Sequence, residues 1–239
     1  TQVDSKLDWA GKTEYTVTTH KYDTNATVLT VTDRFSYSPQ DRLTQHKQQI
    51  NSLPEQLIIQ NTYEELGQLI SKKVDGTNVS PSATGLQKVD YGYNIRGWLT
   101  KINNVENLNN NGSTTDLFAF KINYDQVDND INHQINKLYN GNISETYWKT
   151  NSDNVLRKYE YAYDKLNRLL EANYKKPDNP NIIDSYLERL DYDKNGNITS
   201  LVRNGDLDAN DFAIEIDDLV YTYDDYNNNQ LMKVLDKSN

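Results

Sequence analysis

Cysteine is absent from the 239 residues, and the chain has only one methionine, five prolines and ten glycines. Without cysteine there is no disulfide, no thiolate nucleophile and no cysteine-ligated metal. No apolar run approaches the roughly 20 residues that a membrane-spanning helix needs, so we expect no membrane span. Cationic charge is also scarce, since 25 Lys and Arg face 35 Asp and Glu for a net charge of −10. Nucleic-acid binders need clustered cationic charge, so we expect no nucleic-acid partner.

Tyrosine and asparagine are abundant instead. The sequence has 18 Tyr, 4 Phe, 3 Trp and 31 Asn. A mean hydropathy of −0.88 would predict disorder if aromatic residues were scarce, but these rings supply large buriable surfaces. Asparagine tolerates positive φ and suits tight turns. The composition therefore predicts a folded, β-rich chain with many turns.

A short motif recurs along the chain with the consensus Y-x-Y-D/N-x-x-G/N/D-R/Q/N-L. The spacing between successive anchor tyrosines runs from 26 to 39 residues, as expected for a strand-repeat array whose loops differ in length. The residues that we expect to carry the motif are Tyr37, Tyr63, Tyr93, Asn94, Gly97, Tyr124, Asp125, Tyr163, Asp164, Arg168, Tyr192, Asp193, Gly196, Tyr223 and Asp224. The Tyr124-Asp125 copy is degenerate.

The motif has the pattern of a β-hairpin. Tyrosines at alternate positions, as in Tyr159, Tyr161 and Tyr163, lie on one face of a strand. The acid or amide that follows opens a turn by accepting backbone N–H groups, and a later Gly or Asn takes up positive φ. Leucine then starts the return strand. Repeated hairpins predict an all-β, continuous antiparallel sheet.

Four polar inserts interrupt the pattern, and we expect residues 75–84, 103–115, 175–181 and 204–211 to be loops. For the domain organisation we expect N-terminal strands with a degenerate repeat over residues 1–33. An array of about six to seven repeats should fill residues 34–239, with no separate catalytic domain. Repeat arrays need capping units, and no capping unit follows the last repeat. This predicts a larger parent protein.

The motif resembles the signature of the YD-repeat, or RHS-repeat, proteins. Tyr163-Asp164 with Asn167-Arg168-Leu169, and Tyr93-Asn94 with Arg96-Gly97-Trp98-Leu99, are similar to the family's tyrosine-aspartate and Gly-Arg-Leu turn. Asn140-Gly141-Asn142-Ile143 and Asn195-Gly196-Asn197-Ile198 resemble its second recurring turn. Several phrases look like the version in secreted Bacteroidetes-type members. The resemblance covers most of residues 34–234.

That resemblance implies a long sheet that spirals into a hollow shell, of which this chain would form an arc. Shells of the family often enclose a C-terminal toxin or other cargo, and some members lie on the cell surface. The family's self-cleaving segment, with its Asp-Pro-x-Gly context, has no match here. The implied localisation is secreted or cell-surface, in a bacterium. The implied partners are the remainder of the same polypeptide, with further repeats and a C-terminal cargo.

Enzyme chemistry finds little support in the sequence. His20, His46 and His133 are isolated, and no serine lies in a nucleophile elbow. The acids that follow the anchor tyrosines are explained by turn formation, although paired acids also serve glycoside hydrolysis. Residues 206–217 resemble a calcium loop but lack its glycine and final glutamate, which favours a solvated acidic loop. We expect no catalytic residue, no metal and no cofactor.

Three functions therefore stay open. The first is a structural, non-enzymatic segment of a shell that encloses or carries a toxin or effector cargo. The second is a cell-surface adhesion or carbohydrate-binding module that uses aromatic rows, with Trp98 and Trp148 as test positions. The third is a secretion substrate bound to export machinery, because such a partner could cover an open sheet edge.

Overall fold

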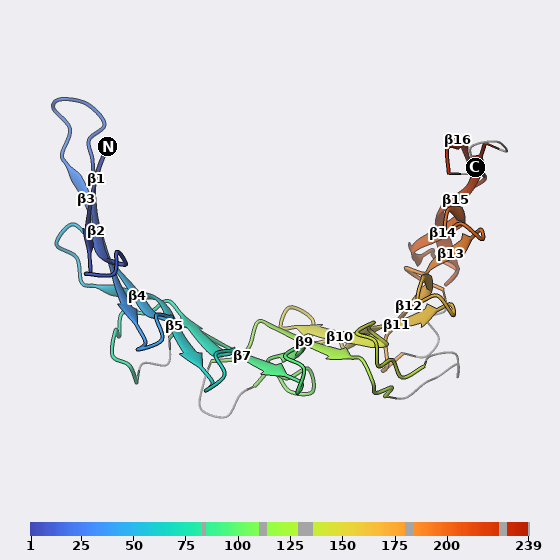
Figure 1. Cartoon of the computed structure of the whole chain (residues 1–239), viewed down its shortest axis with the longest axis horizontal. Coiled ribbons are helices and arrows are strands. Elements are labelled where there is room, and N and C mark those ends of the chain that lie inside the picture. The colour runs from blue at the N-terminus through green and yellow to red at the C-terminus, as the bar shows by residue number, and fades with distance from the viewer. Residues whose placement is uncertain (83–84, 110–113, 129–135, 180–183, 225–228, 239) are drawn as a thin grey trace. The chain divides into compact units, whose positions relative to one another are not determined.

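The structure, a computed structural model, describes residues 1–82, 85–109, 114–128, 136–179, 184–224 and 229–238. These residues divide into two compact units, Thr1–Leu117 and Phe118–Asn239. Both units are antiparallel β-structure, and neighbours in the sheet are neighbours in the chain (Figure 1). The predicted all-β fold of repeated antiparallel hairpins is confirmed.

The described residues of the first unit form eight strands. They are β1 (Gln2–Leu7), β2 (Thr13–His20), β3 (Leu29–Tyr37), β4 (Leu43–Ile50), β5 (Gln56–Tyr63), β6 (Leu69–Val74), β7 (Gln87–Tyr93) and β8 (Leu99–Ile102). Each anchor tyrosine of this unit is the last residue of its strand, and the next strand begins at Leu43, Leu69 or Leu99. The strand boundaries therefore coincide with the motif.

Eight further strands are formed by the residues that the structure describes in the second unit. They are β9 (Phe118–Asn123), β10 (Glu145–Thr150), β11 (Arg157–Tyr163), β12 (Leu169–Lys175), β13 (Glu188–Tyr192), β14 (Ile198–Leu207), β15 (Ala213–Tyr223) and β16 (Leu231–Asp236). The loop expected over residues 204–211 is shorter than predicted, because β14 continues to Leu207 and the turn begins at Asp208. The described residues of the other three inserts lie largely between strands.

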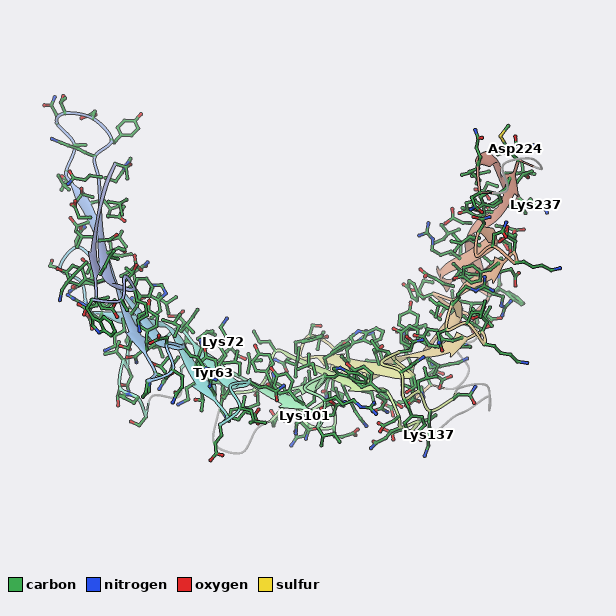
Figure 2. All side chains as sticks on the ribbon, in the orientation of Figure 1. Tyr63, Lys72, Lys101, Lys137, Asp224 and Lys237 are labelled. Carbon is green, nitrogen blue, oxygen red and sulfur yellow. The ribbon has the colours of Figure 1, made fainter. Side chains whose placement is uncertain are left out.

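Each unit is a single layer of strands with side chains on both faces (Figure 2). Burial is therefore modest, and most strand positions are half-buried. The most buried apolar side chains are Leu57, Val105 and Leu108 in the first unit and Ala119, Tyr147, Ala172, Tyr174 and Leu187 in the second. A sheet with so small a core needs other contacts between its hairpins.

Strand register separates two faces in the second unit. Lys158 pairs with Tyr147, whereas Tyr159 pairs with Tyr174. Because successive side chains point to opposite faces, Tyr159, Tyr161 and Tyr163 share one face, which we call the tyrosine face. Lys158 and Glu160 lie on the other, which we call the polar face.

Candidate functional site

Across the described ranges of the chain, seven five-residue turns share one geometry and form its repeated element. They span residues 8–12, 38–42, 64–68, 94–98, 164–168, 193–197 and 208–212. In each turn the backbone N–H of position 1 donates to the carbonyl of position 5 at 2.7–2.9 Å, and that of position 4 donates to the carbonyl of position 1 at 2.9–3.2 Å. This is a type I turn closed by a residue in the left-handed region, a common three-residue hairpin loop.

The side chain at position 1 holds the turn from inside. Asp164 Oδ1 accepts the backbone N–H groups of Leu166 and Arg168 at 2.8 and 2.9 Å. The equivalent oxygens of Asn94 and Asp193 make the same pair of bonds, at 2.8–3.0 Å. The backbone N–H of Arg168 lowers the pKa of the Asp164 carboxyl, and the Asn197 side chain lowers that of Asp193. These carboxylates are turn acceptors.

Position 4 requires positive φ in every one of these turns. The φ values at this position run from 63° to 101°, and four of the seven residues are glycines, Gly97 and Gly196 among them. Asn167 takes the same conformation at φ 63°. Glycine reaches this region without a Cβ clash, and Asn or Asp reaches it at small cost.

Six anchor tyrosines join neighbouring hairpins through their hydroxyl groups. Each hydroxyl donates to a backbone carbonyl near the start of the preceding strand, at 2.8–3.0 Å. The pairs are Tyr37 with Thr13, Tyr63 with Leu43, Tyr93 with Leu69, Tyr163 with Ile143, Tyr192 with Leu169, and Tyr223 with Ile198. We call these contacts the tyrosine latches. Each one satisfies a carbonyl at the turn end of the adjacent hairpin.

The side chain at position 5 contacts the following turn, whereas the tyrosine latch contacts the preceding hairpin. Arg168 Nη1 donates to the carbonyl of Asp193 at 3.1 Å, and its guanidinium lies 4.5 Å from the centroid of the Tyr192 ring. In the first unit Gln68 Nε2 donates to the carbonyl of Gly97 at 3.2 Å. The arginine, glutamine or asparagine of the motif thus connects successive turns.

Two copies of the motif depart from this pattern. Tyr124 and Asp125 lie directly after β9, and the Tyr124 carbonyl accepts the backbone N–H of Leu138 at 2.8 Å. Asp224 opens a longer turn, in which its N–H donates to the carbonyl of Gln230 at 2.9 Å. Tyr124, Asp125 and Asp224 therefore lie at hairpin ends without the shared five-residue turn.

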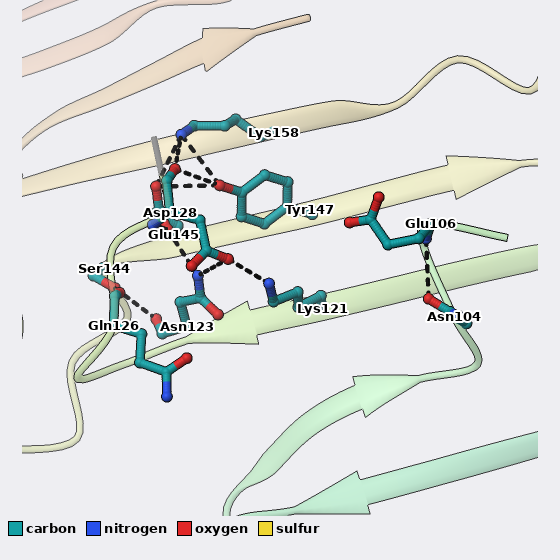
Figure 3. Close-up of polar contacts among 10 residues, drawn as sticks. All are labelled: Asn104, Glu106, Lys121, Asn123, Gln126, Asp128, Ser144, Glu145, Tyr147 and Lys158. Carbon is teal, nitrogen blue, oxygen red and sulfur yellow. Dashed lines mark hydrogen bonds and ion pairs between the residues drawn. The ribbon is translucent and has the colours of Figure 1, made fainter. Parts of the chain in front are cut away.

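A buried ion cluster lies on the polar face close to the degenerate copy (Figure 3). The Lys158 ammonium lies 2.8 Å from Glu145 Oε1 and 2.5 Å from Glu160 Oε1, and these three residues are 1%, 0% and 3% exposed. It also donates to the Tyr147 hydroxyl at 3.2 Å and to the Asp128 carbonyl at 3.1 Å. A lysine this buried needs such partners.

The same cluster ties the segment after β9 to the sheet. Glu145 Oε2 accepts the side-chain amide of Asn123 and the backbone N–H of Asp128, each at 2.8 Å. The Tyr147 hydroxyl donates to the Asp128 carbonyl at 2.9 Å, and Asp128 also forms an ion pair with Lys121. Glu145 is thus the point at which β9, β10, β11 and the following loop meet.

The charged groups of this cluster stabilise one another inside the fold. Burial by itself lowers the pKa of Lys158, but the hydrogen bonds that its ammonium donates to Glu145 and Glu160 outweigh burial and raise that pKa above its ordinary value. Burial raises the pKa of Glu160 despite the opposing effect of Lys158. The Lys121 ammonium lowers the pKa of Asp128. Lys158 is therefore held as a cation, whereas a nucleophile or general base would need a free amine.

The remaining candidate groups have ordinary surroundings. His46 Nε2 lies 2.7 Å from Asp33 Oδ1 and its ring stacks on Phe35 at a centroid distance of 4.6 Å, while His20 Nδ1 lies 2.7 Å from the Thr1 hydroxyl. His133 lies outside the described residues. Within the ranges that the structure describes, no group of three or more His, Asp or Glu side chains is arranged to hold a metal ion.

Sequence reasoning missed the turns at Asp8 and Asp208 and the ion cluster. Both turns follow a leucine in place of the anchor tyrosine. The aspartate at position 1, followed by Gly11 or Asp211 at position 4, is the sequence pattern that could have predicted them. The supposed calcium loop at 206–217 contains the second of these turns, where Asp208 Oδ1 accepts the N–H groups of Asn210 and Phe212.

No family of proteins has a model that matches this chain, and no curated protein matches it. Among solved structures, the Tc holotoxin pore of Photorhabdus luminescens is 13% identical and matches 98% of this chain and 13% of its own, with a TM-score of 0.35. The TcdB2-TccC3 complex is 12% identical over 92% of this chain and 15% of its own, with a TM-score of 0.26. A porin-like protein from Bacteroides uniformis is 10% identical over 85% of this chain and 94% of its own, also at 0.26. The chain spans a small part of the two toxin chains, and likenesses this weak carry no functional argument.

In the part of the chain that the structure describes, no helix is long and apolar enough to cross a membrane.

Proposed function

We propose that this chain is a structural β-repeat segment of a larger secreted protein of the YD/RHS-repeat type. Its role is to form part of a shell wall that encloses or carries a C-terminal toxin or effector cargo. The observation that carries the proposal is the set of six tyrosine latches, each of which joins one hairpin to the hairpin before it. An array of nearest-neighbour contacts can be extended by further repeats without change.

The polar side chains that recur in the repeats make contacts within the fold. Asp164, Asp193 and Asn94 hold their own turns, and Arg168 and Gln68 contact the following turn. Each of these polar groups has a backbone hydrogen-bond partner within the repeats. With the shell role we propose a non-enzymatic function, the remainder of the same polypeptide as the main partner, and a secreted or cell-surface location.

The native protein that contains this segment provides the test. Its intact mass and peptide map should show a chain far above 27.7 kDa, with further repeats and a divergent C-terminal domain. The divergent domain should resist protease in the intact particle and be digested once the repeats are unfolded. Replacing Tyr163, Tyr192 and Tyr223 together by Phe should shorten its protected lifetime.

Tyr22→Phe provides the matched control, because the Tyr22 side chain is 89% exposed and lies outside the motif. It should leave protection unchanged. A native chain that ends near Asn239, or a C-terminal domain digested equally fast with and without a folded repeat region, contradicts the shell proposal.

A further inference from the structure

Four aromatic rings form a continuous patch on the tyrosine face of the second unit. Trp148 of β10 stacks on Tyr159 of β11 at a centroid distance of 5.7 Å and an interplanar angle of 18°. Tyr174 of β12 lies 5.9 Å from Trp148, 5.6 Å from Tyr159 and 5.3 Å from Tyr186, which precedes β13. We call these four residues the aromatic patch. Tyr174 is its floor at 4% exposure, while Tyr186 is 41% exposed.

Tyr186 adopts a conformation that its residue type avoids. Its φ is +51°, in the left-handed region that glycine and asparagine enter far more easily than a bulky aromatic residue. The backbone is held there because its N–H donates to the Gly205 carbonyl at 2.8 Å and its carbonyl accepts the Tyr159 hydroxyl at 3.0 Å. A strained, exposed aromatic residue at a position suited to glycine points to a use for the ring.

The rim of the aromatic patch carries groups of both signs. Burial and the exposed Asp206 carboxylate raise the pKa of the Tyr186 hydroxyl, whereas the Arg157 guanidinium lowers it, so both charged groups lie near this ring. Burial raises the pKa of the Tyr174 hydroxyl and the nearby Arg157 guanidinium opposes that shift. Arg157 also pairs with Asp153, its Nη1 lying 3.2 Å from Asp153 Oδ1. The guanidinium supplies donors, and the two carboxylates supply acceptors.

We propose that the aromatic patch binds a neutral polysaccharide by stacking of pyranose rings on Tyr186, Trp148 and Tyr159. Pyranose rings present apolar C–H faces to aromatic rings and hydroxyl groups at their edges, which both donate and accept hydrogen bonds. Arg157 meets the accepting oxygens, and Asp153 and Asp206 meet the donating hydroxyls. The two carboxylates repel acidic sugars, which makes neutral chains the better fit. This binding is additional to the shell role and does not depend on it.

Affinity electrophoresis of the 239-residue chain tests the proposal. Native gels containing laminarin, galactomannan, xyloglucan or yeast mannan are compared with gels containing alginate. We expect at least one neutral polysaccharide to retard the chain, and Tyr186→Gly to weaken the apparent affinity at least tenfold. Tyr186→Gly removes the ring but relieves the backbone at φ +51°, so the variant should keep the melting temperature within a few degrees.

Two further variants make the result decisive. Trp148→Phe should weaken binding less than Tyr186→Gly, because a smaller aromatic face remains. Tyr22→Ala changes an exposed residue of the other unit and should bind as the parent chain does. No retardation by any neutral polysaccharide overturns the proposal. So does retardation by alginate alone, or binding that is unchanged in Tyr186→Gly.

Discussion

At the scale of single residues, the anchor tyrosines combine two tasks. The ring covers part of a thin sheet, and the hydroxyl satisfies a backbone carbonyl of the neighbouring hairpin. Tyrosine suits this position better than phenylalanine, since phenylalanine would leave that carbonyl without its side-chain donor. The hydroxyl group thus explains why the second aromatic position of the motif is tyrosine.

Removing one latch hydroxyl should cost a measurable amount of stability. Tyr192→Phe deletes the donor 2.8 Å from the Leu169 carbonyl and keeps the ring. A net loss of about 0.5–1.5 kcal/mol in the free energy of unfolding is expected for one such hydrogen bond. Urea unfolding followed by circular dichroism measures it. Tyr22→Phe should leave the urea midpoint unchanged, and an equal shift in both variants would contradict the latch.

The ion cluster predicts a larger effect. Lys158→Met leaves Glu145 and Glu160 buried without their cation, and a loss of about 3–5 kcal/mol is expected at pH 7. Adding Glu145→Gln and Glu160→Gln to the same variant should restore much of the loss, because no charge then stays buried. Urea unfolding of the single and triple variants makes the comparison. If the triple variant is as unstable as the single one, packing rather than charge explains the effect.

The Lys158→Met loss should also depend on pH in a defined direction. Glu160 already has a raised pKa from burial, and without Lys158 that pKa rises further. A carboxyl group whose pKa is higher in the folded state than in the unfolded state binds protons preferentially when folded, so acidification through its folded pKa favours folding. The difference between Lys158→Met and the parent chain should therefore shrink from pH 7 to pH 5. A difference that is constant or grows over this range contradicts the assignment.

At the scale of elements, the shared turn explains why the strands and turns of the repeats could be predicted from the sequence. The alternation in Tyr159, Tyr161 and Tyr163 predicted β11, and Asp164 with Asn167 predicted the turn that follows it. Turn chemistry is local, so a motif of nine residues contains most of what determines it. The latches follow from the same tyrosines, but their carbonyl partners depend on which strands are neighbours.

The ion cluster could not be predicted in the same way. Lys158 and Glu160 alternate with tyrosines, a pattern typical of a solvated face. They are buried because register places Glu145 and Tyr147 beside them and because the segment at Asp128 covers them. The Asn204–Asp211 insert was misjudged for a related reason, since Asn204 and Leu207 pair with residues of β15. Strand register, and the segment that covers a strand, depend on residues far apart in the sequence, so a local motif does not predict them.

The turn geometry predicts opposite effects for two substitutions at position 4. Gly196→Ala places a Cβ at φ 93° and should lose about 1–2 kcal/mol. Asp211→Gly removes the Cβ at φ 64° and should gain a few tenths of a kcal/mol to about 1. Thermal unfolding of both variants is the measurement. Equal signs for the two substitutions would show that backbone conformation does not dominate at this position.

At the scale of the whole molecule, contacts are confined to neighbours. Among the described strands, every pair that makes contact is a pair of consecutive strands in the chain. The turns, the latches and the residues at position 5 also act between adjacent hairpins. In such arrays each repeat is stabilised by its two neighbours. A substitution in one repeat is therefore expected to destabilise that repeat and the adjacent ones more than distant ones.

Hydrogen exchange should show this limited spread. In Tyr192→Phe, backbone amides of β12, β13 and β14 should exchange faster, because the lost hydroxyl joins β13 to the start of β12. Amides of β1 to β6 belong to the other unit and should exchange as in the parent chain. Mass spectrometry of peptic fragments separates these regions. A uniform acceleration over all strands would mean that the chain opens as one cooperative body, and the latches would then be contributors to a global stability and not couplings between neighbouring repeats.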